Sequence, residues 1–129
     1  MVVLQFLNIF FHITHVLIIS FILVGWAFNT TRKIHAAIVV LTLFSWIGLG
    51  FFYGWGYCFW TDWHWSVRDR LGIPHPASYL KLFADTITNK EWNAGMIDFI
   101  TAILFLFVIV LTLVVNLRQR NHEPLEHFQ

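Results

Sequence analysis

The most restrictive feature of this chain is its opening stretch, because residues 2–28 contain no Asp, Glu, Lys or Arg. A helix rises about 1.5 Å per residue, so this stretch is longer than the roughly 20 residues that cross a hydrocarbon core of about 30 Å. Residues 34–53 and 96–117 form two further apolar stretches of spanning length. The sequence therefore predicts an all-α membrane protein, a single membrane domain with three transmembrane helices.

The composition supports lipid as the solvent for much of the chain. Of the 129 residues, 58% are hydrophobic and 12% are charged, whereas an average soluble domain has about 25% charged residues. A soluble domain this small could not bury so much apolar surface. The net charge of +1, without a basic run, argues against nucleic acid as a partner. The one cysteine excludes an internal disulfide and a zinc site built from several cysteines.

Residues 54–95, between the second and third stretches, form a mixed insertion in which we expect two short helices. The first would begin at Thr61 or Asp62, both good N-cap residues, and end at Gly72 before Pro74. We expect one face of this helix to carry Trp63, Val67 and Leu71. The rest of the helix surface would then carry His64, Arg68 and Asp69.

A second helix is indicated by an apolar repeat at helical spacing, made of Ala77, Leu80, Ala84 and Ile87. Lys81 and Asp85 stand at the i,i+4 spacing of a helical ion pair. This segment is too short and too polar to span, so we expect an amphipathic helix that lies in the membrane interface. The third span would follow a capping box that runs from Thr88 to Glu91.

Lys and Arg in the short flanking segments set the expected orientation. Arg32 and Lys33 follow the first span, and Arg118 and Arg120 follow the third, so both pairs would lie on one side of the membrane. The positive-inside rule makes that side the cytoplasm, where the tail, residues 118–129, would lie. We therefore expect a bacterial inner-membrane protein whose N-terminus and Trp-rich insertion face outward.

A polar stripe runs along the first span. It begins at Gln5 and continues, at offsets of 3, 7 and 10 residues, with Asn8, His12 and His15. These offsets place all four side chains on one face of a helix. A polar group in hydrocarbon needs a partner, so we expect the stripe to face the other helices or a water-filled gap. Near the outer end of the third span, Asp98 is the expected partner of His12.

Three interpretations of this stripe remain open. Its side chains could make interhelical hydrogen bonds that fix the register of the helices. They could bind haem or a metal ion, because neutral imidazole is a common ligand of both. They could also line a quinone site or a proton path. Against haem, His12 and His15 lie on one helix, and His35 lies at the opposite end of the bundle.

The insertion opens with an aromatic block, residues 54–65, that holds four tryptophans and the cysteine. Trp and Tyr collect at membrane interfaces because each has an apolar body and a hydrogen-bonding group. Cys58, Asp62 and His64 are residue types that bind metals, but their spacing matches no standard zinc site. Cys58 could instead be a free thiol. The sequence has no Ser-His-Asp order, phosphate-binding loop or carboxylate pair, which argues against catalysis.

Cys58, Thr61 and Arg68 stand at the offsets of a Cys-Pro-Leu-Thr motif and a following Leu-Arg pair. Over residues 10–115 the chain resembles a family of small bacterial membrane proteins, a domain of unknown function, that carries this motif. Phe59 and Trp60 replace the Pro-Leu pair, and His64 stands where the family often has Glu. The resemblance implies a membrane location and a few-helix fold, and it implies no activity.

Two functional hypotheses follow. In the first, the protein is a non-catalytic subunit or accessory component of a larger membrane complex, with other membrane subunits or further copies of itself as partners. In the second, it is a small redox protein that binds haem, a metal ion or a quinone. The second hypothesis would use His12, His15, Asp98 and His64.

Overall fold

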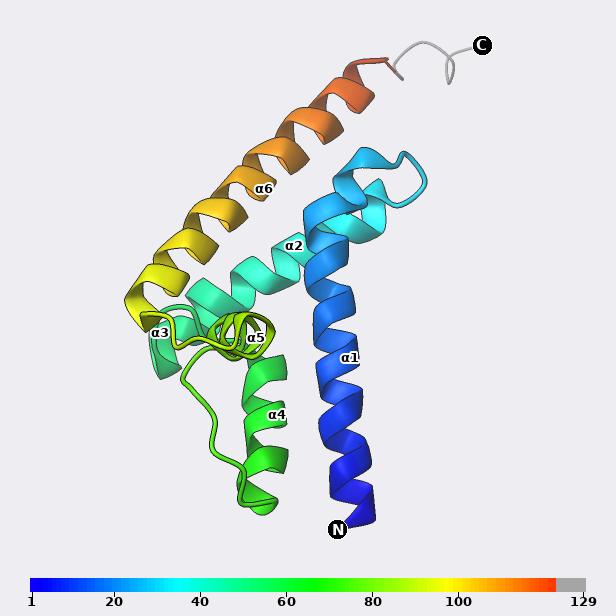
Figure 1. Cartoon of the computed structure of the whole chain (residues 1–129). Coiled ribbons are helices and arrows are strands. Elements are labelled where there is room, and N and C mark those ends of the chain that lie inside the picture. Colours follow the sequence, from blue (N-terminus) through cyan, green and yellow to red (C-terminus); the bar gives the residue numbers. More distant parts are fainter. Residues whose placement is uncertain (123–129) are drawn as a thin grey trace.

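The computed structural model describes residues 1–122, in which helices joined by short loops are the regular secondary structure and no strand occurs (Figure 1). The first long segment is α1 (Val2–Val24), extended by the short 3-10 helix η1 (Gly25–Ala27). The second is built from α2 (Arg32–Leu43), the π-helix η2 (Phe44–Leu49) and α3 (Gly50–Tyr53). The insertion forms α4 (Phe59–Arg70) and α5 (Tyr79–Thr88), and the chain continues into α6 (Ala94–His122). The all-α fold class is confirmed.

Three helical segments are long and apolar enough to cross a membrane, namely Val2–Ala27, Arg32–Tyr53 and Ala94–Asn121. They correspond to the three apolar stretches of the sequence. Figure 1 shows α2 crossing α1 near the C-terminal end of α1, while α6 runs obliquely above α2. The N-terminal half of α1 extends below this crossing and lies beside α4. The orientation of the segments, and the placement of residues 54–95 at the membrane surface, stay predictions.

The apolar core of the described residues is small. Val39 of α2 packs with Phe105 and Val108 of α6, and the partly buried side chains around them are Ile22, Leu43, Trp46 and Ile109. The rings of Trp46 and Phe105 lie 4.7 Å apart between centroids. Most other apolar side chains of the long helices point outward, as expected of surfaces that face lipid or another protein.

The π-helix η2 joins the second long segment to the start of the insertion. Its Ser45 is buried; the hydroxyl donates to the carbonyl of Tyr57 at 2.9 Å and accepts from the N–H of Phe59 at 3.3 Å. The N–H of Gly56 donates to the carbonyl of Trp46 at 3.3 Å. The loop can fold back this tightly because Gly54 and Gly56 adopt positive φ angles of 115° and 83°. Short local bonds therefore fix the position at which α4 begins.

The structure corrects the predicted start of α4 and shows which of its faces is buried. The helix begins at Phe59 with Cys58 as its N-cap residue, so Asp62 lies in the first turn and does not cap the helix. Of the apolar residues expected on one face, Val67 is buried, whereas Trp63 is 53% exposed. The buried face carries Thr61, His64, Trp65, Val67 and Arg68. Polar side chains are buried on this face because the polar stripe of α1 offers them hydrogen-bond partners, as Asn8 does for His64.

The second insertion helix agrees with the sequence in part. Ser78 caps α5 by accepting from the N–H of Lys81 at 3.4 Å, and the predicted ion pair between Lys81 and Asp85 forms. The predicted capping box from Thr88 to Glu91 is wrong, because Thr88 is the last residue of α5. Instead, Asn93 Oδ1 accepts from the N–H of Met96 at 3.0 Å at the start of α6. Of the predicted tail, residues 123–129 lie outside the described residues.

Candidate functional site

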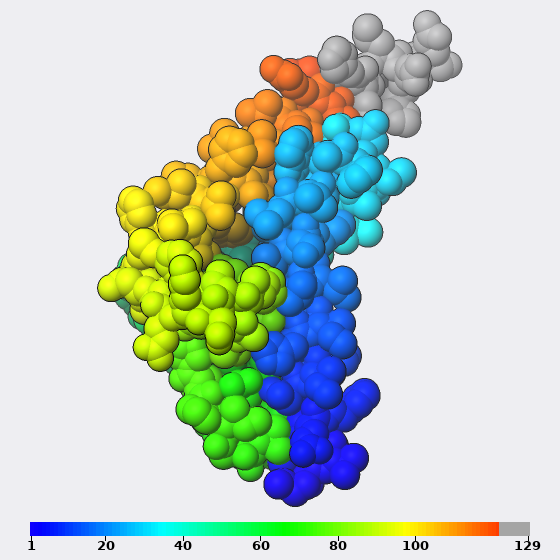
Figure 2. Space-filling view, viewed as in Figure 1, coloured from blue at the N-terminus to red at the C-terminus, as the bar shows by residue number. Residues whose placement is uncertain are grey.

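Polar side chains from three helices meet beside the N-terminal half of α1. We call this group the His–Tyr cluster, and its members are Asn8, His12, His15, His64 and Tyr79. Figure 2 shows α4 and α5 packed against that half of α1. The cluster brings three of the four stripe residues of α1 together with a histidine of the aromatic block, whereas the fourth, Gln5, is exposed.

Two hydrogen bonds connect the cluster across the helices. The amide oxygen Oδ1 of Asn8 lies 2.8 Å from Nε2 of His64, which donates to it in the matching tautomer. The Tyr79 hydroxyl lies 3.1 Å from Nδ1 of His12 and 3.4 Å from the His12 carbonyl oxygen. The hydroxyl therefore has two proton arrangements. It donates to Nδ1, or it donates to the carbonyl while Nδ1–H donates to it.

The aromatic rings of the cluster are also in direct contact with one another. Tyr79 stacks on His15 with 3.8 Å between ring centroids and 15° between ring planes. His12 meets His64 edge to face at 4.6 Å. The Phe11 ring also stacks on His64, with 5.6 Å between ring centroids and 15° between ring planes. The edge-to-face geometry of His12 and His64 is one that adds to the stabilisation that burial alone provides.

The cluster is withdrawn from solvent. The exposed fraction is 0% for His64, 4% for Tyr79 and 7% for His15. Within the described residues, the Nδ1 atoms of His15 and His64 have no hydrogen-bond partner. A buried polar atom without a partner costs about 1–3 kcal/mol. These two atoms are therefore the places where the cluster could accept a ligand or a water molecule.

Charge around the cluster is predominantly positive. Arg68 is buried next to it; its guanidinium donates to the carbonyl of Pro74 at 2.8 Å and lies 5.8 Å from the Trp65 ring. Burial, together with the neighbouring histidines and Arg68, lowers the pKa of His64 to about 3. Burial also raises the pKa of the Tyr79 hydroxyl. His64 and Tyr79 are therefore both neutral at pH 7.

The structure separates the predicted site residues into two groups. Asn8, His12, His15 and His64 come together, with Arg68 adjacent. Asp98 is exposed on α6, and His12 contacts Tyr79 and His64 in the place of the expected carboxylate. The predicted pairing of His12 with Asp98 is corrected accordingly, because α5 supplies the partner that α6 was expected to supply.

The motif residues at the start of α4 lie apart from the cluster. Cys58 is a half-buried free thiol, Thr61 is buried, and the exposed Asp62 accepts from the Tyr57 hydroxyl at 3.1 Å. Across residues 1–122, no group of three or more His, Cys, Asp or Glu side chains is arranged to hold a metal ion. The metal hypothesis therefore has no ligand set in that part of the chain.

Sequence reasoning missed Tyr79, Trp65 and His75. Tyr79 joins the cluster from the first turn of α5, and no local pattern connects it with α1. His75 stacks on Trp65 at 4.5 Å and lies 3.1 Å from Asp69. The one available signal was Ser78, a strong N-cap residue that places Tyr79 at the start of a helix.

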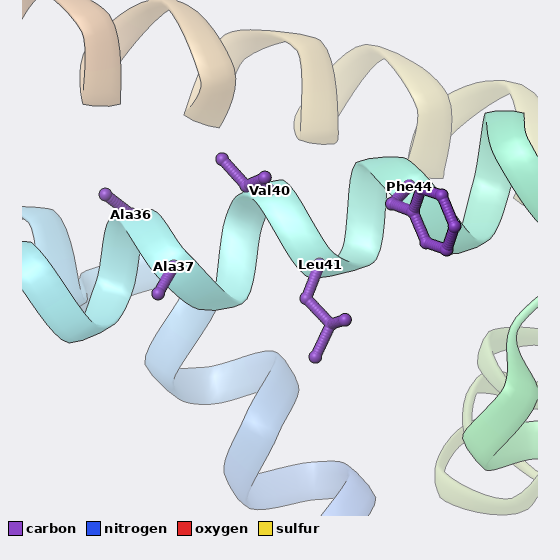
Figure 3. Close-up of a pocket in the computed structure, with 5 residues that line it drawn as sticks. All are labelled: Ala36, Ala37, Val40, Leu41 and Phe44. Carbon is purple, nitrogen blue, oxygen red and sulfur yellow. The ribbon is translucent and has the colours of Figure 1, made fainter.

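A separate apolar hollow lies on the surface of α2, away from the cluster. It is lined by Ala36, Ala37, Val40, Leu41 and Phe44. Figure 3 shows the small alanine side chains at one end of the hollow and the Phe44 ring at the other. The hollow offers no polar side chain, so its chemistry suits an apolar helix or an acyl chain and not a polar substrate.

A family of proteins of unknown function, DUF2784, matches residues 5–117 of the chain. No curated protein and no solved structure matches it. The matched region includes the three long apolar segments in nearly their whole length and all of α4 and α5. The chain therefore belongs to the DUF2784 family.

Proposed function

We propose that this protein is a non-catalytic subunit or accessory component of a larger membrane assembly. The observation that carries the proposal is how little its long helices bury one another. In the most apolar 18-residue window of each candidate span, 6% of the first and 17% of the second and third are buried within the chain. Such helices leave most of their side chains available to a partner.

Membrane physics explains why this exposure matters. In lipid, helices gain no hydrophobic driving force by meeting, so their association depends on close packing and interhelical hydrogen bonds. Among residues 1–122, the apolar cluster between α2 and α6 contains three buried residues, Val39, Phe105 and Val108. A further helix from a partner would supply the packing that the chain itself does not supply.

The hollow on α2 is the best candidate for the contact with that partner. Small residues at a helix surface let another helix backbone approach closely. Ala36 and Ala37 provide such a surface, and Val40, Leu41 and Phe44 border it with larger apolar groups. The partner we propose is an apolar transmembrane helix of another membrane protein.

In this proposal the His–Tyr cluster is a scaffold. Its hydrogen bonds and stacked rings hold α4 and α5 on α1, so that the insertion has one position relative to the first span. This is the role of interhelical hydrogen bonding among the interpretations of the stripe. The aromatic block then sits where the chain meets the membrane–water boundary.

The test is affinity purification from the native host membrane in a mild detergent, followed by native electrophoresis and mass spectrometry. We expect a membrane polypeptide to accompany the wild-type protein in fixed stoichiometry. Ala37→Phe fills the hollow and should release that polypeptide, whereas Ala102→Phe, the same change at an exposed site on α6, should retain it. Recovery of the wild type as a stable lone monomer would overturn the proposal, and recovery as a homo-oligomer would replace the foreign partner with a second copy.

We also propose that the protein lies in a bacterial inner membrane with its N-terminus outside and its C-terminus in the cytoplasm. The pairs Arg32–Lys33 and Arg118–Arg120 support this orientation through the positive-inside rule. A membrane-impermeant maleimide should label the single Cys58 in intact spheroplasts. The variant Cys58→Ser with Arg118→Cys should be labelled only after lysis, and the reverse pattern would contradict the orientation.

A second candidate function is binding of a quinone at the His–Tyr cluster. It is favoured by the unpartnered Nδ1 atom of His15, since an imidazole in its Nδ1–H tautomer can donate to a quinone carbonyl. Protein extracted gently from native membrane should then carry about one quinone per chain, and His15→Ala should lose it. Absence of a bound quinone and of any visible absorption band would leave the scaffold role.

A further inference from the structure

His64 is the central side chain between α4 and α1. It is fully buried, it pairs with Asn8 through Nε2, and its ring contacts Phe11 and His12. Trp60 adds a second connection, since its indole N–H donates to the Thr14 hydroxyl at 3.2 Å. The helix α4 therefore contacts α1 at two positions, around the neutral imidazole of His64 and around the Trp60 indole, which also packs on Phe11.

None of the ionisable groups that face His64 could stabilise its protonated form. Each is either cationic or neutral, so a positive charge on the imidazole would have no counter-ion. From α1 come His12 and His15, from α4 comes Arg68, from the segment before α5 comes His75, and from α5 comes the neutral Tyr79. The carboxylates of α4 are engaged elsewhere, Asp62 with Tyr57 and Asp69 with His75. Asp85 of α5 is paired with Lys81.

The hydrogen bonding of His64 points in the same direction. In the neutral ring Nε2–H donates to Asn8, and Nδ1 has no partner. Protonation would turn Nδ1 into a second buried donor and add a positive charge beside Arg68. While α4 stays docked, the new N–H has no hydrogen-bond acceptor and the positive charge has no anionic partner.

We propose that α4 and α5 form an acid-released latch, in which protonation of His64 undocks both helices from α1. Release would uncover the polar stripe of α1, including His12 and His15, together with the inner face of α4. The latch would respond to acidification of the aqueous compartment that the insertion faces.

The direction of the pH effect follows from linkage between protonation and docking. The docked pKa of His64 is lowered to about 3, whereas the undocked side chain has its ordinary pKa of about 6.5. Docking is therefore strongest above pH 6.5 and weakens as the pH falls towards 3. For this single proton, the equilibrium constant for undocking rises about 30-fold between pH 7.5 and pH 5.

The test is hydrogen exchange measured by mass spectrometry on the full chain in lipid nanodiscs between pH 7.5 and pH 5. Rates are corrected for the intrinsic pH dependence of exchange, and peptides of α4 are compared with peptides of α2. We expect protection of α4 to fall about 30-fold while protection of α2 stays constant. A flat profile for α4 in the wild type would overturn the latch.

Two variants assign the effect to His64. His64→Gln keeps a side-chain donor for Asn8 and cannot be protonated, so its α4 protection should not change with pH. His75→Gln removes a half-buried histidine that pairs with Asp69, and its α4 peptides should keep the wild-type pH response. Equal pH responses in His64→Gln and the wild type would overturn the proposal. If His64→Gln fails to fold, His64→Asn replaces it, and a pH response of α4 in that variant equal to the wild-type response would likewise overturn the proposal.

Discussion

Tyr79 of α5 stacks face to face on His15 of α1, with ring centroids 3.8 Å apart. The same tyrosine places its hydroxyl 3.1 Å from Nδ1 of His12, one turn earlier on α1. One side chain thus connects the insertion with two members of the polar stripe. This contact gives α5 a fixed position although α5 itself is short and carries one fully buried residue.

Removing only the Tyr79 hydroxyl should separate its hydrogen bond from its stacking. Tyr79→Phe keeps the ring against His15 and leaves Nδ1 of His12 without its partner, so we expect a loss of about 1 kcal/mol in the free energy of unfolding. Tyr79→Ala should lose about 3–5 kcal/mol, because it also removes the buried ring. Detergent-denaturation curves followed by tryptophan fluorescence measure both. Tyr53→Phe, at an exposed tyrosine, serves as the control and should leave the curve unchanged.

The long helices could be predicted from sequence and the cluster only in part, for identifiable reasons. A helix in lipid needs a long uncharged run, so the absence of charge in residues 2–28 predicts the first candidate span, Val2–Ala27, to within one residue. The stripe of Asn8, His12 and His15 was visible because helical spacing is local. Its partners were not visible, since contacts with α4 and α5 depend on how the chain folds back.

The errors in the insertion have local causes. The sequence predicted that Trp63, Val67 and Leu71 share one face of α4, but it did not show which face is buried. Because α1 presents Asn8 and His12 to α4, His64 is buried against them, whereas Trp63 is exposed. The sequence from Thr88 to Glu91 fits a capping box, yet Asp85 Oδ1 accepts from the N–H of Trp92 at 2.8 Å. That bond stabilises a turn between α5 and α6 that the capping pattern does not contain.

Asn8 and His64 should be energetically coupled. Each single change to alanine leaves the other polar group buried without its partner, and we expect each to cost about 1–3 kcal/mol in unfolding free energy. The double variant should cost less than the sum of the two, with a coupling energy of about 0.5–3 kcal/mol. A double-mutant cycle in one detergent measures this energy directly. Strict additivity would show that the 2.8 Å contact contributes nothing to stability.

Arg68 should hold the segment between α4 and α5 in place. Its guanidinium donates to the Pro74 carbonyl at 2.8 Å, and its own carbonyl accepts from the N–H of Ile73 at 2.9 Å. Arg68→Ala removes the first bond, so limited proteolysis within residues 71–78 should become several-fold faster. Arg70→Ala, at an exposed position of the same helix, should leave the rate unchanged. Equal rates for the two variants would contradict this role.

The sparse packing between the long helices led us to propose that the protein functions within a larger membrane assembly. Native mass spectrometry of material ejected directly from host membranes tests it most simply, because no purification step can strip a weakly held partner. We expect the 15.2 kDa chain to appear bound to another membrane polypeptide in fixed stoichiometry, and we expect Ala37→Phe to shift it to the free form. A wild-type spectrum that contains only the free 15.2 kDa chain would show that the protein has no such partner.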